Sequence, residues 1–464
     1  MPLFPTHRLL CACCVILAWG VLCLWAWRQA RRRTAAQAFA AHELHTPATE
    51  QTILIAHASQ TGQAEAIAHQ TADTLRQGGL RTRVAALGQL DLSLLQTHPR
   101  LLIVASTYGE GDPPDSAAAF ADTVMTTRPD TDATRLSRLH YAVLALGDSE
   151  YHHFCGFGRQ LDTWLRDRGA TPLFDRVEAD NADPAALRHW QHHLGLLTGR
   201  SDLPDWEPPT YRPWRLIERT HLNPGSQGDP CFHLVLTPPD ETDALWQAGD
   251  IAEIGPRKTR AGELQPHREY SIASIPADGA VHLLVRQMHQ ENGQLGLGSG
   301  WLTHVAHIGD EIDLRLRTNS NFHPPDDSRP MLLIGNGTGL AGLRALLKAR
   351  IAAGHHRNWL IFGERNAAHD WFYREEIKGW LADGKLERLD AVFSRDTNER
   401  RYVQHQLLAQ CDLVHQWINA GADIYVCGSL QGMAQGVDEA LATILGENAL
   451  ATLRHENRYR RDVY

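Results

Sequence analysis

The chain has 464 residues, a length that suits about three domains. Hydrophobic residues form 43% of it and charged residues 21%, which is typical of a globular protein and excludes a disordered one. The net charge of −9 gives no basis for a nucleic-acid partner. The 8 cysteines show no paired spacing of the zinc-binding kind, so no metal site is predicted.

An uncharged apolar run, residues 9–27, lies near the start of the chain. It is long enough to cross a bilayer, and its tryptophans suit the membrane interface. Arginine precedes the run once and follows it four times, at Arg8 and then at Arg28, Arg31, Arg32 and Arg33. Because positive residues stay on the cytoplasmic side, we predict a single-pass membrane anchor over residues 1–29, a tether over 30–51 and catalytic domains that face the cytoplasm. A cleaved signal peptide is the competing interpretation.

From Thr52 to residue 200 the pattern predicts a doubly wound α/β domain. Short apolar runs at residues 53–56, 101–105 and 141–146 are typical of buried parallel strands. Between the first two, apolar residues recur at helical spacing until Gly78 and Gly79.

A loop of special composition follows each of these strands. The loop residues are Ser59, Gln60, Thr61 and Gly62 after the first, Thr107, Tyr108 and Gly109 after the second, and Gly147, Tyr151 and Phe154 after the third. In such a sheet the loops meet at the carboxyl edge, where ligands bind. The first can cradle a phosphate at a helix N-terminus, and the tyrosines can flank a flat ring. We therefore predict an FMN site; ordinary turns and core tyrosines are the alternative.

A proline-rich linker, residues 201–214, precedes a change of pattern. Short strands at residues 232–236, 251–254, 281–285 and 311–316, separated by turn signals, predict a small antiparallel barrel over residues 215–327. One strand carries Arg268 and Tyr270 on one face and Ser271 on the other. A glycine loop with Gly296, Gly298 and Ser299 then precedes a predicted helix and forms a second anion cradle.

The α/β pattern returns over residues 328–464. A buried strand at 331–334 leads into the loop 335–339, which contains Gly337 and Thr338, and then into a helix over 340–350. Gly337, Gly339 and Gly342 match the dinucleotide fingerprint formally, but in a shifted register. Further on lie Ser394, Arg395, Arg400, Tyr402 and Gln404. Arginines with hydroxyls suit a ribose 2′-phosphate, and a solvated basic loop is the alternative.

The last residue, Tyr464, is aromatic, although chain ends usually fray. We hypothesise that it stacks on a flavin where the strand 268–271, the loop 335–339 and a buried strand ending in Cys427 and Gly428 meet. A disordered tail is the alternative.

Taken together, these motifs in this order resemble the diflavin reductases, most closely their sulfite reductase flavoprotein branch. The resemblance runs from about Thr52 to Tyr464. It implies a flavodoxin-like FMN domain followed by a ferredoxin–NADP reductase-like FAD barrel and an NADP-binding α/β domain. It also implies a role for Asp180 near the FMN ribityl chain. FMN, FAD and NADPH are the implied cofactors.

The resemblance further implies that Ser271, Cys427 and Asp462 act at the site of hydride transfer, and that Tyr464 covers the flavin. Three positions depart from the family: Asn336 replaces a proline, Gly342 a residue of a Pro-Phe pair, and Ser429 an acidic residue. The helical connecting insert of larger relatives is missing, so the arrangement of the two flavin domains does not follow from the resemblance.

Three functions remain open on the sequence. We favour a membrane-anchored NADPH reductase that passes electrons through FAD and FMN to a one-electron acceptor, a haem or iron protein at the membrane. The second is the flavoprotein component of a sulfite reductase. The third is a flavin-binding redox sensor or assembly subunit without catalytic activity, against which Ser271, Cys427 and Asp462 argue together.

Overall fold

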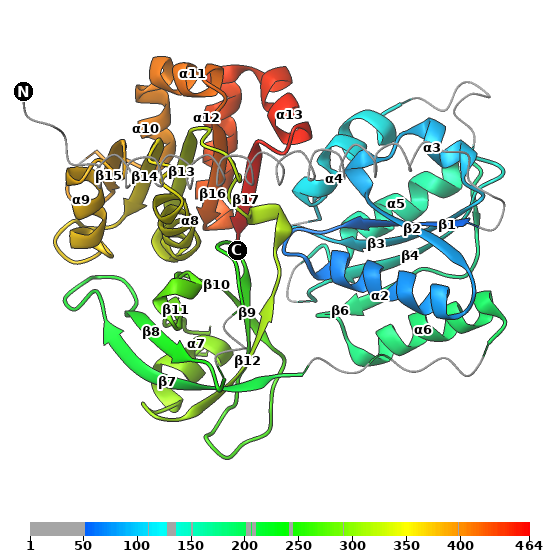
Figure 1. Cartoon of the computed structure of the whole chain (residues 1–464), viewed down its shortest axis with the longest axis horizontal. Coiled ribbons are helices and arrows are strands. Elements are labelled where there is room, and N and C mark those ends of the chain that lie inside the picture. The colour runs from blue at the N-terminus through cyan, green and yellow to red at the C-terminus, as the bar shows by residue number, and fades with distance from the viewer. Residues whose placement is uncertain are drawn as a thin grey trace, which may run out of the picture.

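The structure is a computed structural model that describes residues 52–109, 111–127, 136–149, 152–200, 206, 210–240, 245–290, 292–397 and 399–464. Its three sheets meet near the middle of the molecule, where the C-terminus lies (Figure 1). The C-terminus thus lies close to all three sheets, which are formed by different parts of the sequence.

The first sheet is parallel, in the order β2-β1-β3-β4-β5, with β6 paired to β4. The strands are β1 (Thr52–Ala58), β2 (Arg81–Ala86), β3 (Arg100–Ser106), β4 (His140–Gly147), β5 (Thr171–Pro172) and β6 (Val177–Asp180). The helices are α2 (Gln63–Gln77), α3 (Leu92–Thr97), α4 (Asp115–Ala119), α5 (Gly156–Asp167) and α6 (Pro184–Thr198). This strand order is that of flavodoxin-like folds.

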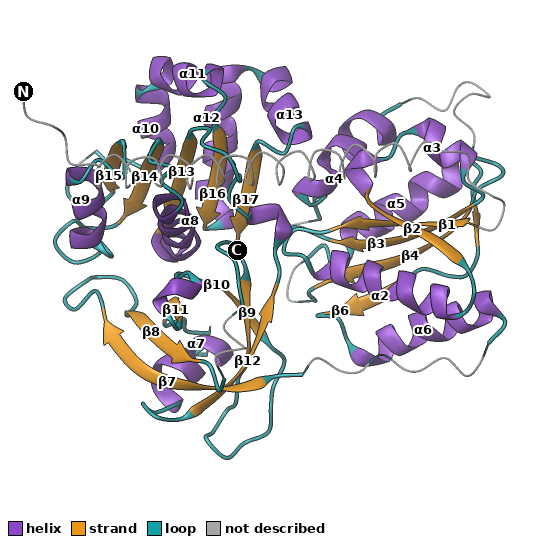
Figure 2. Cartoon of the chain, in the orientation of Figure 1, coloured by secondary structure: helices purple, strands orange, loops and turns teal. Residues whose placement is uncertain are grey.

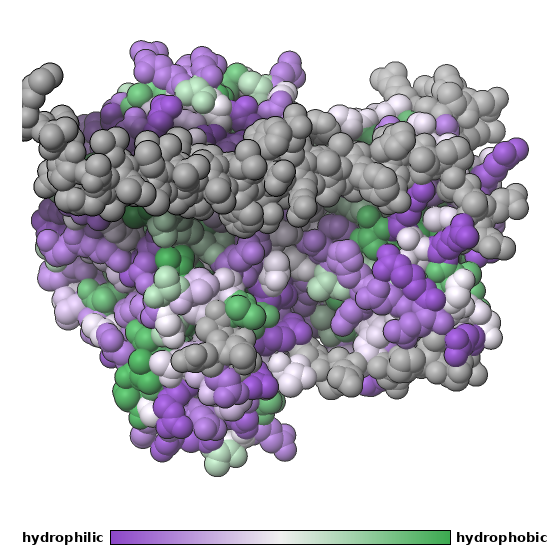
Figure 3. All heavy atoms as spheres, in the orientation of Figure 1, coloured by the Kyte–Doolittle hydropathy of each residue, from purple (hydrophilic) through white to green (hydrophobic). Residues whose placement is uncertain are grey.

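Helices cover both faces of this sheet because its strands are apolar on both sides (Figure 2). Ile53 and Ile55 pack with α2 and α6 on one face, and Leu54 and Ala56 pack with α5 on the other. The outer surface of this domain, at the right of the space-filling view, is mostly hydrophilic (Figure 3).

The second sheet is antiparallel, in the order β10-β9-β12-β7-β8-β11. The strands are β7 (Arg212–His221), β8 (Cys231–Thr237), β9 (Ile251–Gly255), β10 (Arg268–Ser271), β11 (Val281–Arg286) and β12 (Glu311–Arg317), and α7 (Leu297–Gly300) follows β11. Just past β10, the N–H of Ala273 donates to the carbonyl of His282 on β11, so the sheet closes on itself. Its interior holds Trp214, Trp246 and Trp301.

The third sheet is parallel, in the order β15-β14-β13-β16-β17. The strands are β13 (Met331–Asn336), β14 (Asn358–Glu364), β15 (Arg388–Phe393), β16 (Asp423–Gly428) and β17 (Tyr459–Val463). The helices are α8 (Leu340–Ala352), α9 (Arg374–Ala382), α10 (Val403–Ala409), α11 (Cys411–Asn419), α12 (Gln435–Leu445) and α13 (Glu447–His455). The predicted fold class, a flavodoxin-like domain with a reductase-like barrel and α/β domain, is confirmed.

Side-chain alternation along β16 decides where Cys427 points. Val426 packs with α12 on one face of the sheet, whereas Tyr425 and Cys427 pack with α8 on the other. The cluster on the α8 face also contains residues of the barrel, among them Ala273 and Phe322. The barrel and the third sheet therefore share one hydrophobic core.

The predicted membrane localisation is contradicted. Across the described part of the chain, no helix combines the length and the apolar character that a bilayer span requires. The predicted anchor (1–29) and tether (30–51) lie outside the described residues. The prediction rested on the length and composition of one apolar run together with its flanking arginines.

Candidate active site

A cavity of about 900 Å³ opens between the barrel and the third sheet. It brings together most of the residues that the sequence assigned to FAD and NADPH. Those that line it are Arg268, Tyr270, Ser271, Gly296, Gly298, Ser299, Gly337, Thr338, Ser394, Arg395, Tyr402, Gln404 and Tyr464. Segments separated by up to 196 positions in the chain thus face one space that is large enough for a cofactor.

On the barrel side, β10 and the glycine loop before α7 lie in direct contact. A Cβ atom at Gly298 would stand 2.5 Å from the hydroxyl of Tyr270 and 2.8 Å from Cβ of Arg268, so only glycine fits. The hydroxyl of Ser299 accepts from the N–H of Met288 at 3.0 Å, which fixes the loop. A backbone held this close to an arginine suits an anionic group such as the FAD pyrophosphate.

Beneath the cavity wall, three buried side chains converge from β10, β16 and β17. The hydroxyl of Ser271 donates to Oδ2 of Asp462 at 2.7 Å, and the thiol of Cys427 donates to the same oxygen at 3.7 Å. Cys427 and Asp462 are register partners in the parallel pair β16–β17. The sequence separates these residues by up to 191 positions, and the fold unites them.

Burial dominates the protonation of this group. Loss of water raises the pKa of Asp462 above its usual range, although the hydrogen bond from Ser271 opposes the shift. Burial, and then the charge of Asp462, raise the pKa of Cys427 well above the ordinary thiol value. The thiol is therefore neutral at physiological pH and serves as a small polarisable group and weak donor rather than as a thiolate nucleophile.

The C-terminal residue is held in place. The N–H of Tyr464 donates to the carbonyl of Gly428 at 3.0 Å, and its own carbonyl accepts from the N–H of Leu430 at 3.0 Å. Its hydroxyl donates to Thr338 at 3.2 Å, and its ring lines the cavity with the residue 53% exposed. The alternative of a disordered tail does not describe this arrangement.

Of the arginines predicted to bind the 2′-phosphate of NADPH, one does not line the cavity. Arg401 lines the cavity together with Arg395, whereas Arg400 does not. Two adjacent arginines before a helix give no periodicity from which to choose between them. Arg286 and Glu364 also line the cavity and pair with each other, and Arg286 had no local motif that would have identified it.

The three departures from the family pattern lie around the buried group. Oδ1 of Asn336 accepts from the N–H of Ser429 at 2.9 Å, so two of the unusual residues bind each other. A Cβ atom at Gly342 would stand 3.3 Å from the sulfur of Cys427 and 3.6 Å from Cβ of Ser271. Two of the three substitutions are therefore bonded to each other, and the third packs against Cys427 and Ser271.

The loop predicted to bind the FMN phosphate, Ser59–Gly62 (the phosphate loop), faces the other two sheets. Gln60 donates to the carbonyl of Arg461 at 2.5 Å, and Thr61 accepts from Arg317 of β12. The hydroxyl of Ser59 is buried and has no hydrogen-bond partner within the described structure. A buried hydroxyl beside the N-terminus of α2 fits the phosphate of FMN.

The other predicted FMN residues lie in three places. Tyr108 packs into the core of the third sheet's domain, beneath the guanidinium of Arg461 at 5.4 Å, and Gly109 abuts Leu430. The sequence predicted that the ring of Tyr108 flanks a flavin, whereas in the structure this ring is buried against residues of the third sheet's domain. The remaining members stay within the flavodoxin-like domain: Thr107 accepts from Phe157, Gly147 abuts Phe154, and Asp180 accepts from Ser149. Tyr151 lies outside the described residues.

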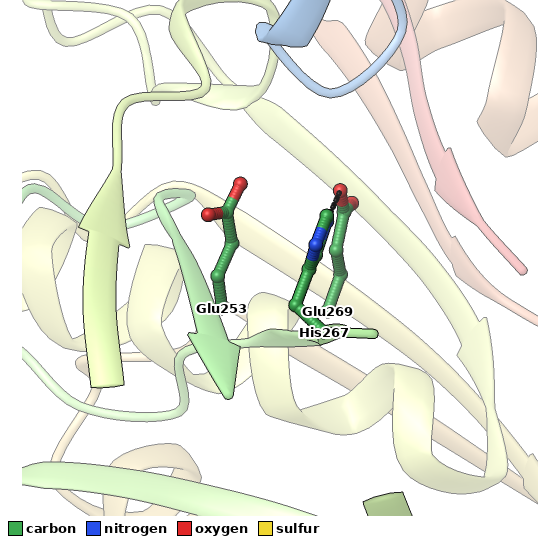
Figure 4. A group of neighbouring side chains, drawn as sticks. All are labelled: Glu253, His267 and Glu269. Atoms are coloured by element: carbon green, nitrogen blue, oxygen red, sulfur yellow. Dashed lines mark ion pairs between the residues drawn. The ribbon is translucent and has the colours of Figure 1, made fainter. Parts of the chain in front are cut away.

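Glu253, His267 and Glu269 form a cluster whose ligand-type atoms lie within 4.8 Å of one another (Figure 4). Both carboxylates are already paired with arginine. Glu253 binds Arg315 and Arg317, and Glu269 lies 2.5 Å from Arg317. Two guanidinium charges thus balance two carboxylates, which makes the cluster an ion-pair network rather than a metal centre.

Comparison with known proteins identifies two domains. Residues 55–190 match a flavodoxin family, and residues 333–439 match an oxidoreductase NAD-binding domain family. The chain is an NADPH-dependent flavoprotein oxidoreductase. Its cofactors are FMN, FAD and NADPH, and the matches support the diflavin reductase family. They do not support the alternative of a sensor without catalytic activity.

The curated relatives include sulfite reductase [NADPH] flavoprotein alpha-components. Those of Neisseria meningitidis and Vibrio cholerae are each 28% identical to the chain over 96% and 97% of its length, and over 95% and 93% of their own. That of Bacillus subtilis is 26% identical over 91% of each chain. The Neisseria alignment spans 577 positions against the 464 residues here, so more than one hundred positions of that relative have no counterpart.

Proposed function

We propose that the chain takes electrons from NADPH through FAD and FMN and delivers them singly to an acceptor protein that contains haem or iron. The observation that carries this proposal is the single cavity in which the FAD-type residues of the barrel face the NADPH-type residues of the third sheet. The flavins and NADPH supply the redox chemistry when bound, and the protein positions them.

The residues around the cavity have separate tasks in this proposal. Arg268, Tyr270, Gly296, Gly298 and Ser299 hold FAD. The loop at Gly337 and Thr338, with Ser394, Arg395, Tyr402 and Gln404, holds NADPH, and Arg401 joins Arg395 or takes the place of Arg400 on the 2′-phosphate. Arginine suits that phosphate because its planar fork matches two oxygens at once.

Asp462 organises the buried group in this proposal. Its Oδ2 accepts from both Ser271 and Cys427, which orients the hydroxyl and the thiol toward one side of the carboxylate. A carboxylate fixed in a water-poor site stabilises positive charge that develops nearby during hydride transfer. Tyr464 covers the same wall of the cavity and must move when nicotinamide approaches.

The flavoprotein component of a sulfite reductase is the second candidate. In its favour, relatives with that name align over nearly the whole chain. Against assigning the function of those relatives directly to this chain, their sequences contain more than one hundred additional positions. Mixing the purified chain with the haemoprotein component of a sulfite reductase distinguishes the two, because only the second candidate gives NADPH-driven sulfite reduction.

The proposal is tested on the purified chain by anaerobic stopped-flow reduction followed by acid extraction of its flavins. We expect FMN and FAD in equal amounts, and flavin bleaching by NADPH that is faster than by NADH. A single flavin species at full occupancy, or flavins that NADPH does not bleach, contradicts the proposal.

A further inference from the structure

A short segment of the barrel, Arg317–Asn321, lies on the phosphate loop of the flavodoxin-like domain. Arg317 donates through Nη1 to the carbonyl and to the hydroxyl of Thr61, the latter at 3.1 Å. Asn321 donates to the carbonyl of Ser59 at 2.8 Å. Ser320 donates to Glu65 in the first turn of α2 at 2.7 Å. Two residues of one domain thus bond to the other domain's phosphate loop, and a third bonds to the helix that follows it.

The backbones also approach one another closely at Gly62. Gly62 has φ +83, and a Cβ atom there would stand 2.2 Å from the carbonyl oxygen of Thr318. Only glycine permits both the left-handed conformation and this contact. The loop is therefore shaped to receive the barrel segment as well as to begin a helix.

Arg317 is held rigidly on its own side of the contact. Its residue is 6% exposed, Nε donates to Glu253 at 2.6 Å, and Nη2 lies 2.5 Å from Glu269. Figure 4 shows the side chains of Glu253 and Glu269 together on β9 and β10. These two carboxylates fix the guanidinium, and the remaining nitrogen, Nη1, reaches across to the phosphate loop.

The phosphate loop lacks a positive charge of its own. Residues 58–65 contain no lysine, arginine or histidine. Thr61 Oγ1 accepts from Arg317, which leaves its O–H free to donate to an anion. The hydroxyl of Ser59 is likewise buried without a partner among the described residues. Two hydroxyl donors and a guanidinium thus lie at one loop, a combination that suits a dianion.

We propose that Arg317 is a positioning residue for the FMN phosphate, supplied by the FAD barrel to a site in the flavodoxin-like domain. The flavodoxin-like domain then holds FMN more tightly when it is docked than when it is separate. Because linkage is reciprocal, bound FMN stabilises the docked arrangement by the same factor. This inference rests on the proposed role of the loop Ser59–Gly62 in FMN binding.

The test measures FMN affinity in the full chain. Flavin-depleted protein is reloaded with FAD and titrated with FMN, and quenching of FMN fluorescence reports binding. Replacing Arg317 with glutamine should weaken FMN binding at least about tenfold, the lower end of the cost of a lost hydrogen bond to a charged group. Arg315→Gln is the matched control, because Arg315 also pairs with Glu253 but is not bonded to Thr61. It should leave the FMN dissociation constant unchanged.

A second variant protects the test against damage to the barrel. If Arg317→Gln fails to retain FAD, Asn321→Ala replaces it, since Asn321 bonds to Ser59 without pairing with Glu253. Small-angle scattering supplies an independent readout. The wild-type chain should be more compact with FMN than without it, and Arg317→Gln should lose that difference.

The inference is overturned if Arg317→Gln retains FAD and binds FMN as tightly as the wild type. If Arg317→Gln does not retain FAD, wild-type FMN affinity in Asn321→Ala overturns it. So does equal compactness of the wild-type chain with and without FMN. A wild-type chain that binds no FMN overturns the proposed function instead, so the two failures are distinguishable.

Discussion

The two interfaces around the barrel differ in chemistry. Toward the third sheet, the barrel contributes Ala273, Leu284 and Phe322 to a hydrophobic core that it shares with α8. Toward the flavodoxin-like domain, it presents Arg317, Ser320 and Asn321, which make polar contacts. Shared apolar cores hold domains together permanently, whereas polar interfaces of this kind permit relative motion.

The same contrast holds for the two cofactor regions. The residues proposed to hold FAD and NADPH face a cavity that the barrel and the third sheet complete by themselves. The phosphate loop at Thr61, in contrast, is completed by contact with another domain. We infer that the reductase half is a fixed unit, and that the FMN site depends on whether the flavodoxin-like domain is docked.

The first prediction concerns acid, which should break the permanent interface. His233 and His282 lie near its edge, and burial lowers the pKa of each to about 4. Charged and titratable groups around them are Glu218, Asp278, Arg344, Lys348, Tyr373 and Glu376. Between pH 6.5 and 4 the unfolded chain binds protons that the folded chain does not, so stability falls as the pH falls.

The largest loss is about 1.4 kcal/mol per pH unit for each histidine. The melting temperature measured from pH 7 to 4.5 reports it. His282→Phe should flatten the curve, because Nδ1 of His282 is buried without a hydrogen-bond partner in the described structure. The exposed His304→Phe is the control. A curve that His282→Phe leaves as steep as that of the wild type contradicts this account.

The second prediction concerns Cys427. Replacement by alanine should slow flavin reduction by NADPH on the order of a hundredfold, if the thiol acts where charge develops. NADPH binding should change little, so kcat falls while KM does not. Stopped-flow absorbance is the measurement.

Cys231→Ala provides the matched control for Cys427. Cys231 is a buried free thiol in the same hydrophobic cluster, and burial raises its pKa to about 12. It has no bond to Asp462, so its removal should cost stability but not hydride-transfer rate. Equal rates for Cys427→Ala and the wild type would leave Cys427 a packing residue only.

The third prediction concerns the polar contact between the flavodoxin-like domain and the third sheet, which is part of the fixed reductase half. Arg461 pairs with Asp115 of the flavodoxin-like domain and with Asp438 of α12. Asp115→Asn weakens the link between domains, whereas Asp438→Asn, the control, leaves it intact. We expect Asp115→Asn to slow electron delivery to cytochrome c up to about tenfold, with flavin reduction by NADPH unchanged. Steady-state reduction of cytochrome c measures electron delivery, and stopped-flow bleaching measures flavin reduction by NADPH. Equal losses in Asp115→Asn and Asp438→Asn would refute the role of the Arg461–Asp115 pair in electron delivery.

The sequence predicted the order of strands and loops well because each is a local pattern. The apolar run at 53–56 and the loop at Ser59–Gly62 need only their own neighbours to be recognised. It could not predict the contact between Arg317 and Thr61, because these residues lie 256 positions apart and no periodicity encodes domain docking. That Arg401 lines the cavity and Arg400 does not shows the same limit at the scale of one residue.

The resemblance to a family predicted what local patterns could not, as the buried group of Ser271, Cys427 and Asp462 shows. No local pattern links Ser271, Cys427 and Asp462, yet the family motifs named all three. The fold brings the hydroxyl of Ser271 and the thiol of Cys427 within hydrogen-bonding distance of one oxygen of Asp462. The link between Asn336 and Ser429 was missed because both residues depart from the family pattern. The hydrogen bond between these two unusual residues becomes visible only when the fold places the ends of β13 and β16 side by side.

The fourth prediction has the smallest expected effect. Removal of the ring in Tyr464→Ala should lower the preference for NADPH over NADH in kcat/KM, mainly by improving NADH. An aromatic stack is worth about 0.5–1.5 kcal/mol, which is a few-fold to about tenfold in kcat/KM. NADPH can offset that cost through its 2′-phosphate contacts. Tyr464→Phe retains the ring and should keep the preference; an unchanged or increased preference in Tyr464→Ala would mean that Tyr464 is not the gate.

Removal of FMN alone tests the central claim most directly, because the claim is that electrons enter at the cavity and leave through the flavodoxin-like domain. NADPH-driven reduction of ferricyanide and of cytochrome c is measured in the holoprotein, after selective FMN removal, and after FMN is restored. We predict that ferricyanide reduction survives FMN removal, while cytochrome c reduction is lost and then returns. Loss of both activities together, or survival of both, would contradict the account.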